Sequence, residues 1–261
     1  MATTPVDELQ ESTPNAQRNF KLTIEYDGGE FCGWQIQPRV RTVQETLEAA
    51  LASVLQEKVR VRGAGRTDAG VHAAGQVANF FTSAPRTAQE IMLGVNAHLP
   101  ADVVVREAVE APAEFDARRG AVQRQYRYLI HNSRIRPALE RHRAAFFAQP
   151  LEVSLMSEGC RRLQGEHDFS GFRSVDCAAR RTVLDLEQAM VRRDGALVQF
   201  DFVCRSFLMN MVRIMVGTLV EIGRGKLAPE IIEELFSSGK RALGGPTFPP
   251  HGLTLVSIAY E

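Results

Sequence analysis

The chain has 261 residues, 44% of them hydrophobic and 24% charged, a balance typical of a folded protein with one large domain or two smaller ones. Lysine plus arginine equals aspartate plus glutamate at 31 each, so the chain as a whole lacks the positive excess that favours binding to phosphates. The most apolar stretch, residues 207–222, is shorter than a bilayer span and contains Asn210 and Arg213, which excludes it as a membrane helix.

The cysteines and histidines give no sign of a metal site or a disulfide framework. His72, His167 and Asp168 are too scattered in the sequence to form a ligand set. No apolar signal segment precedes the four cysteines, and none of them stands in a CxxC pair: Cys32, Cys160, Cys177 and Cys204. We therefore expect reduced thiols, no cofactor or metal, and a cytoplasmic protein.

The first half of the chain predicts a tail followed by alternating strands and helices. Residues 1–18 are polar and contain two prolines, so we expect a mobile tail. Thr42 with Glu45, and Thr87 with Glu90, have the spacing of a capping box at the start of a helix. Periodicity predicts strands at 20–26, 59–62, 77–82 and 103–109, and helices at 42–54 and 87–100.

The second half predicts further strands and helices in a less regular order. An Asp-Gly pair at 194–195 indicates a hairpin between two apolar runs. We expect strands at 122–130, 183–191, 196–203 and 253–260, and helices at 153–163, at 207–222 and opening at Pro229. Many hairpins without strict strand-helix alternation predict the α+β class, with helices on a mixed, largely antiparallel sheet. We place a domain boundary near Pro112, between residues 19–111 and 112–261.

The segment 63–80, GAGRTDAGVHAAGQVANF, is the strongest candidate for a reactive loop. It holds the ionisable Asp68 between Arg66 and His72, among four glycines. Glycines let a ligand approach the main chain closely, so a carboxylate held among them can face a substrate. A glycine-rich turn, in which Thr67 and Asp68 cap local amides, fits the same residues. Neither GxxxxGK[ST] nor GxGxxG is present.

The run GRTDAGVHA resembles the catalytic loop of the TruA family of tRNA pseudouridine synthases, in which the aspartate that matches Asp68 is the nucleophile. Further similar runs begin at Phe31 (FCGWQIQP), Phe115 (FDARRGAVQRQYRYLIHN), Gly165 (GEHDFSGFR) and Phe207 (FLMNMVRIMVGTL). The resemblance covers nearly the whole chain after about residue 18. It implies two similar halves around a central cleft, a cofactor-free isomerase acting at positions 38 to 40 of tRNA, and a homodimer.

A basic segment follows the predicted domain boundary. Eight arginines stand against two acids between residues 116 and 143, and strand alternation puts Arg124, Tyr126 and Tyr128 on one face. Such a face can contact phosphates while a ring stacks on an unpaired base. Without the resemblance, packing of both tyrosines in a core is the favoured interpretation, and Tyr128 is expected to stay structural in either case. We predict that Arg118 and Arg124 contact RNA, while the resemblance implies that Tyr126 lies in the active site.

Arg213 and Asp68 have complementary electrostatic problems. An arginine on an otherwise apolar helix is costly to bury alone, and a pocket that excludes water raises the pKa of a carboxylate. From the residues alone, Arg213 could also extend along apolar surface to reach water. The resemblance implies a basic residue beside the catalytic aspartate, so we predict that Arg213 and Asp68 lie within salt-bridge distance. We also expect Arg66 to hold the RNA open once the target base is flipped out.

Two other functions remain open from the sequence alone. One is a non-catalytic RNA-binding protein that uses the basic and aromatic face. The other is a small-molecule hydrolase in which Asp68 is the base and His72 its partner.

Overall fold

The computed structural model describes residues 17–261, so the predicted tail lies outside the described residues except for Gln17 and Arg18, and Arg18 already belongs to the first strand. The strands are β1 (Arg18–Tyr26), β2 (Arg62–Gly63), β3 (His72–Thr82), β4 (Val103–Ala111), β5 (Ala121–Asn132), β6 (Ala145–Phe147), β7 (Gly165–Asp168), β8 (Val183–Asp194), β9 (Leu197–Cys204) and β10 (Leu253–Tyr260). The helices are α1 (Val43–Leu55), α2 (Ala88–His98), α3 (Val153–Leu163), α4 (Met211–Gly223) and α5 (Ile231–Ser238), with short 3-10 turns η1 (Phe169–Phe172), η2 (Arg241–Leu243) and η3 (Pro250–Gly252).

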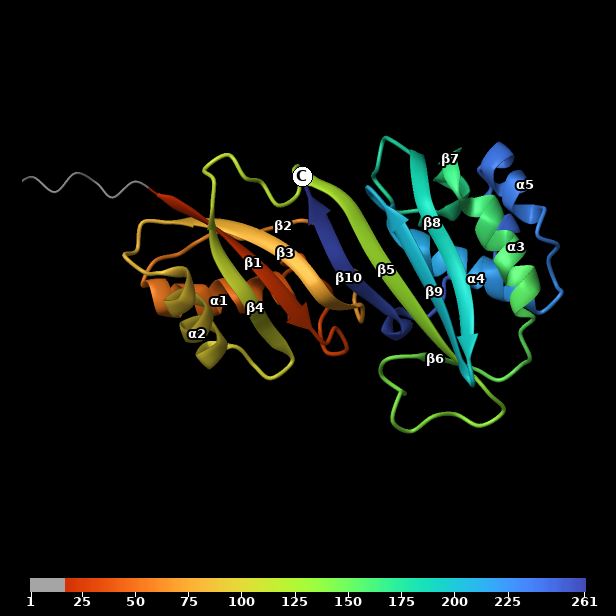
Figure 1. The fold of residues 1–261 in the computed structure, drawn as a ribbon, viewed down its shortest axis with the longest axis horizontal. Coiled ribbons are helices and arrows are strands. Elements are labelled where there is room, and N and C mark those ends of the chain that lie inside the picture. Colours follow the sequence, from red (N-terminus) through yellow and green to blue (C-terminus); the bar gives the residue numbers. More distant parts are fainter. Residues whose placement is uncertain (1–16) are drawn as a thin grey trace, which may run out of the picture.

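All ten strands belong to one sheet, ordered β4-β1-β3-β10-β5-β9-β8-β7, with β2 added to β3 and β6 added to β5 (Figure 1). Neighbours are antiparallel except for the pairs β3–β10 and β5–β6. Along β1 the alternating residues Phe20, Leu22, Ile24 and Tyr26 are all buried, as the period-two pattern predicts. The α+β class and the mixed, mostly antiparallel sheet are therefore confirmed.

Helices cover both ends of this sheet, with α1 and α2 beside β1, β3 and β4, and α3, α4 and α5 beside β7, β8 and β9 (Figure 1). The Thr42 hydroxyl accepts a hydrogen bond from the Glu45 amide at the start of α1. At the start of α2, Thr87 and Glu90 form the full reciprocal capping box. Local caps thus fix both helix starts where the sequence predicts them. No helix within residues 17–261 is both long and apolar enough to cross a bilayer.

Strand β10 joins the two halves, because it pairs with β3 on one side and with β5 on the other. Its first residues, Leu253 and Leu255, are buried between the halves. The predicted domain boundary near Pro112 falls between β4 and β5. Strands from both sides of it belong to one sheet through β10, so the division into two domains stays a prediction.

Three local predictions differ from the structure. The strand expected at 59–62 is limited to Arg62–Gly63, where the chain reaches β3. The helix expected from residue 207 begins at Met211, because Asn210 has a left-handed backbone with φ 60° that cannot continue a helix backwards. Strands β6 and β7 were not predicted, since each is four residues or shorter and too brief to show a period.

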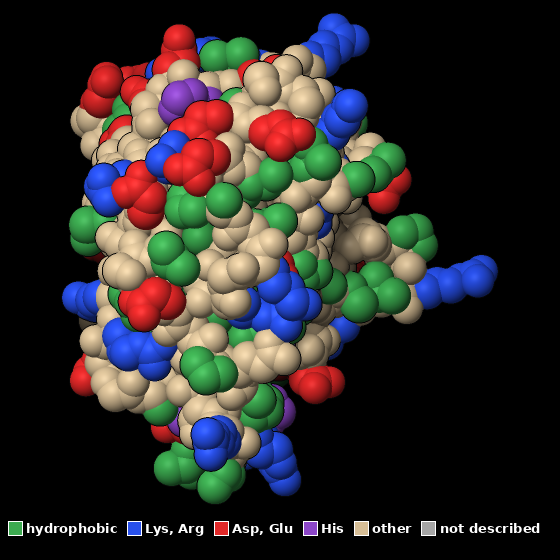
Figure 2. Space-filling view, turned by 90° about the vertical axis from the view of Figure 1, so that its right-hand side faces the viewer, with side chains coloured by type: hydrophobic (Ala, Val, Ile, Leu, Met, Phe, Trp, Pro, Cys, Tyr) green, Lys and Arg blue, Asp and Glu red, His purple; other side chains and the backbone are tan. Residues whose placement is uncertain are grey.

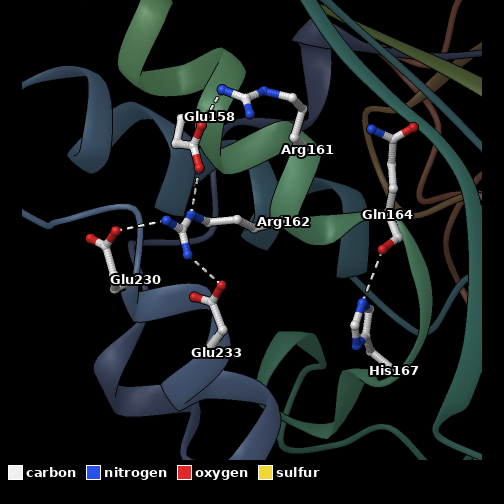
Figure 3. A network of polar contacts seen from close by, with 7 residues as sticks. All are labelled: Glu158, Arg161, Arg162, Gln164, His167, Glu230 and Glu233. Atoms are coloured by element: carbon white, nitrogen blue, oxygen red, sulfur yellow. Dashed lines mark hydrogen bonds and ion pairs between the residues drawn. The ribbon is translucent and has the colours of Figure 1, made fainter.

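The outer end of the molecule, formed by α3 and α5, carries acidic and basic side chains in close alternation (Figure 2). Arg162 of α3 donates to Glu158 at 2.9 Å, to Glu230 at 2.7 Å and to Glu233 at 2.5 Å (Figure 3). The positive charge of Arg162 is therefore neutralised by three neighbouring carboxylates. These ion pairs connect α3 to the start of α5. Arg162 is therefore not available to bind the phosphates of a nucleic acid.

Candidate active site

The loop between β2 and β3, which carries Asp68, is held on both sides by hydrogen bonds. The Trp34 amide donates to the Thr67 carbonyl at 3.1 Å, and the Gly70 amide donates to the Phe31 carbonyl at 3.2 Å. The Thr67 hydroxyl lies 2.7 Å from the Tyr26 hydroxyl in the core beneath. Asp68 therefore sits on a fixed backbone between two anchored neighbours.

A glycine explains how the chain can pass so close to this loop. Gly33 has φ +86°, and a Cβ built on it would lie 2.6 Å from the Thr67 carbonyl oxygen. A side chain at this position would push the backbone next to Asp68 out of place. The FCGWQIQP segment thus shapes the reactive loop from outside.

The predicted pair between Asp68 and Arg213 is present, with Oδ2 of Asp68 3.6 Å from Nη1 of Arg213. The Asp68 side chain is 34% exposed and that of Arg213 is 16% exposed, so the carboxylate faces outward while the guanidinium lies behind it. Arg213 also donates from Nε to the Phe248 carbonyl at 2.7 Å and from Nη1 to Oδ1 of Asn210 at 2.6 Å. The guanidinium is accordingly fixed from three directions.

The pKa of Asp68 remains above its ordinary value. Burial is the larger cause and raises it, while the charge of Arg213 lowers it and offsets only part of that rise. A carboxylate with a raised pKa is more basic than one in water, and the arginine keeps its charged form accessible. This combination suits a nucleophile.

Tyr126 lies in β5 with its ring buried against Phe207, at 5.1 Å between ring centroids in an edge-on arrangement. Burial raises the pKa of Tyr126, and electrostatic interactions with Tyr26 and Asp68 act in the same direction, so its hydroxyl keeps its proton. Tyr128 is fully buried and donates to the Pro249 carbonyl at 2.6 Å, which gives it the structural role expected of it.

The predicted RNA contacts have different environments. Arg118 and Arg66 are exposed. Arg124 is half-buried, and its guanidinium donates to the backbone carbonyls of Ala64 at 2.6 Å, of Arg118 at 3.4 Å and of Arg205. Its donors thus join the start of the reactive loop to two neighbouring segments, and Arg118 is freer than Arg124 to meet a phosphate.

His72 does not face the reaction site as a free base. Its Nδ1 accepts from the Gly28 amide at 3.0 Å and lies 3.1 Å from Oδ1 of Asp27, and its Nε2 donates to the His251 carbonyl at 3.2 Å. Burial lowers the pKa of His72, which agrees with a neutral ring. The hydrolase hypothesis therefore loses its second catalytic group. Within residues 17–261, no three His, Cys, Asp or Glu side chains gather as a group able to hold a metal ion.

Some residues that hold the site were not predicted from the sequence. Gln76 is fully buried in β3 and donates to the Gly65 carbonyl at 3.0 Å. The sequence did contain a sign of this role, because Gln76 is a polar residue inside a mostly apolar strand. A buried amide needs a hydrogen-bond partner, so such a residue is expected to bind a neighbouring segment. Tyr26 and the Phe248 carbonyl gave no comparable signal, since each is recognised only by a partner distant in the sequence. Asn210 lies only three residues from its partner Arg213, but nothing in the sequence indicates that its side chain turns to that residue instead of capping the helix.

Comparison with known families defines the class of protein. The sequence model of a family described as tRNA pseudouridine synthase matches residues 22–118 and 160–261, which include both Asp68 and Arg213. The chain is therefore a pseudouridine synthase, an isomerase.

Individual relatives narrow this class to one family. Three similar proteins carry the name tRNA pseudouridine synthase A. Those of Geotalea uraniireducens and Geobacter sulfurreducens are each 44% identical over 243 residues, which is 93% of this chain and 100% of the relative. That of Methylobacillus flagellatus is 45% identical over 240 residues, 92% of each chain. The chain belongs to the TruA family of tRNA pseudouridine synthases.

Proposed function

We propose that this protein converts uridine to pseudouridine at positions 38 to 40 in the anticodon arm of tRNA, with Asp68 as the nucleophile. The observation that carries the assignment of Asp68 is its 3.6 Å ion pair with Arg213, on a loop that is anchored at Thr67 and Gly70. Family membership supports the reaction, and the names of the relatives support tRNA as the substrate.

The reaction rearranges bonds without a change in oxidation state. The bond between C1′ of the ribose and N1 of uracil breaks, the base turns, and C5 of the base joins C1′. The proton on C5 leaves to solvent and N1 gains one, so atoms and charge balance. An attacking carboxylate divides this exchange into two easier steps through a covalent intermediate. Attack of Asp68 on the ribose and attack on the base both fit the site.

The target base must leave its stack to reach Asp68. Arg66 lies two residues from Asp68 and is exposed, which supports a role in holding the opened RNA. The Tyr126 ring would lie against the flipped base. Arg118 would bind backbone phosphate, and Arg124 would contribute chiefly through the segments that it joins.

The family resemblance also supports a homodimer in which two subunits share one tRNA, and a tRNA substrate supports a cytoplasmic location. Sedimentation of the free protein and of its tRNA complex would test the dimer directly.

The activity is tested with unmodified tRNA transcripts carrying uridine tritiated at C5. Formation of pseudouridine releases tritium to water, and primer extension after chemical marking of pseudouridine locates the position. We expect release confined to positions 38 to 40. Tight binding of tRNA without release would instead identify a non-catalytic RNA-binding protein.

A further inference from the structure

Asn210 has an unusual backbone for its position in the chain. It immediately precedes α4 with φ 60° and ψ 4°, in the left-handed region that residues other than glycine seldom adopt. Among residues 17–261, the other non-glycine residues with positive φ are Arg39 and Gln56. An asparagine at this place ordinarily accepts a hydrogen bond from the first turn of the helix, but the Asn210 side chain makes no such bond.

The side chain of Asn210 is directed instead at Arg213. Its Oδ1 accepts from Nη1 of Arg213 at 2.6 Å, the same nitrogen that lies 3.6 Å from Asp68. The Phe248 carbonyl accepts from Nε of Arg213 at 2.7 Å. Because a guanidinium is planar and rigid, two acceptors at separate nitrogens fix the orientation of the whole group.

We propose that Asn210 is a positioning residue, which adopts the left-handed conformation in order to aim the Arg213 guanidinium at Asp68. This inference rests on the proposed role of Asp68 as nucleophile. Asn210 would act through Arg213 and would not itself touch the reacting base.

The charged and titratable groups around Asp68 determine what the loss of Asn210 should do. Arg213 faces it from α4, Tyr126 from β5, and Arg66 lies in the same loop, exposed. Of these, Arg213 lowers the pKa of Asp68 against the effect of burial. A guanidinium that is free to turn away would stabilise the carboxylate less, so a higher pH would be needed to ionise it.

The test is Asn210→Gly, which removes the acceptor while glycine accepts the same backbone conformation. We expect kcat for tritium release to fall by about 10- to 100-fold, as for other small misplacements at reacting groups, with little change in KM. The acid limb of the kcat–pH profile should move to higher pH. Thermal unfolding should occur at no lower temperature than in the wild type.

Gln56→Gly is the matched control, because Gln56 has a similar backbone (φ 58°, ψ 24°) at the end of α1, on an exposed surface. It should leave kcat and the pH profile unchanged. Asn210→Asp, which keeps an acceptor oxygen at the same place, should restore most of the turnover lost in Asn210→Gly.

Wild-type kcat in Asn210→Gly, or a lower kcat with an unmoved acid limb, would overturn the proposal. So would equal activity of the glycine and aspartate variants, because the acceptor would then be irrelevant. If Asn210→Gly unfolds early, Asn210→Asp decides by its kcat on the plateau above the acid limb, because its added carboxylate would itself move that limb to higher pH. A plateau kcat far below that of the wild type would then count against the proposal. Activity that survives Asp68→Asn would instead contradict the role of Asp68 as nucleophile. The failure of the proposed function can therefore be told apart from the failure of the proposal for Asn210.

Discussion

Asp68 is a half-buried acid, and the charge of Arg213 offsets only part of the rise in pKa that burial causes. This has a consequence for stability as well as for chemistry. Its pKa in the folded protein is raised, so the native state holds the proton more tightly than the unfolded chain does. The stabilisation linked to that proton is present below the unfolded pKa of about 4 and is lost as the pH rises through the raised value.

Asp68→Asn imitates the protonated form permanently and removes the nucleophile. We expect tritium release to fall by about three orders of magnitude or more while tRNA binding survives. At pH 7 the variant should unfold at a higher temperature than the wild type, and this gain should shrink as the pH is lowered toward 4. Residual activity within about tenfold of the wild type would refute the covalent role.

Tyr126 presents a protonated hydroxyl at the same site. Tyr126→Phe keeps the ring against Phe207 and removes only the oxygen, so tRNA binding should be unchanged. If the hydroxyl has a chemical role, single-turnover release should slow by about 100-fold. A wild-type rate would leave the ring with a stacking role alone.

At the scale of elements, the reactive loop depends on a neighbouring segment that makes room for it. Gly33→Ala would place a methyl group 2.6 Å from the Thr67 carbonyl oxygen and displace the backbone beside Asp68. We expect kcat to fall by about 100-fold, since small displacements of a reacting group are costly.

Gly195→Ala is the control for the backbone effect, because Gly195 also has positive φ (+55°) but nothing within 4 Å of its Cβ position. It should cost about 1 kcal/mol of unfolding free energy and leave kcat unchanged. Equal losses of kcat in both alanine variants would show that the close approach at Gly33 is unimportant.

The elements that the sequence predicts well are those whose signals are local. Thr42 and Thr87 fix helix starts through neighbours three residues away, and α3 follows the predicted bounds Val153–Leu163. The pairing of Asp68 with Arg213 was also predicted, because each charge needs a partner and the family resemblance implies a basic residue beside the catalytic aspartate. Arg124 shows the limit, since a basic residue on a basic strand looks like a phosphate ligand until the carbonyls that accept from it are known.

At the scale of the whole molecule, the zero net charge hides an uneven distribution. The α3–α5 end neutralises its own arginines, while Arg118 stands exposed next to the segment that Arg124 joins to the reactive loop. We therefore expect tRNA to lie over the Asp68 side of the sheet and away from that end.

Arg118→Ala and Arg162→Ala form a matched pair for this expectation. Removal of one phosphate contact should reduce the slope of log affinity against log salt by roughly one unit for Arg118→Ala. Arg162→Ala should leave that slope unchanged, because three glutamates already hold its guanidinium. Filter binding over a range of salt concentrations measures both, and equal slopes for the two variants would place the RNA elsewhere.

The central place of β10 also constrains when the enzyme can become active during its synthesis. The ribosome makes β3 and β5 long before β10, yet β10 lies between them and carries the contacts that join the two halves. A nascent chain that stalls before Leu253 holds the Asp68 loop and the Arg213 helix without the strand that joins their halves. We therefore expect catalytic competence only after β10 has left the exit tunnel, and a chain truncated before Leu253 should fail to modify tRNA.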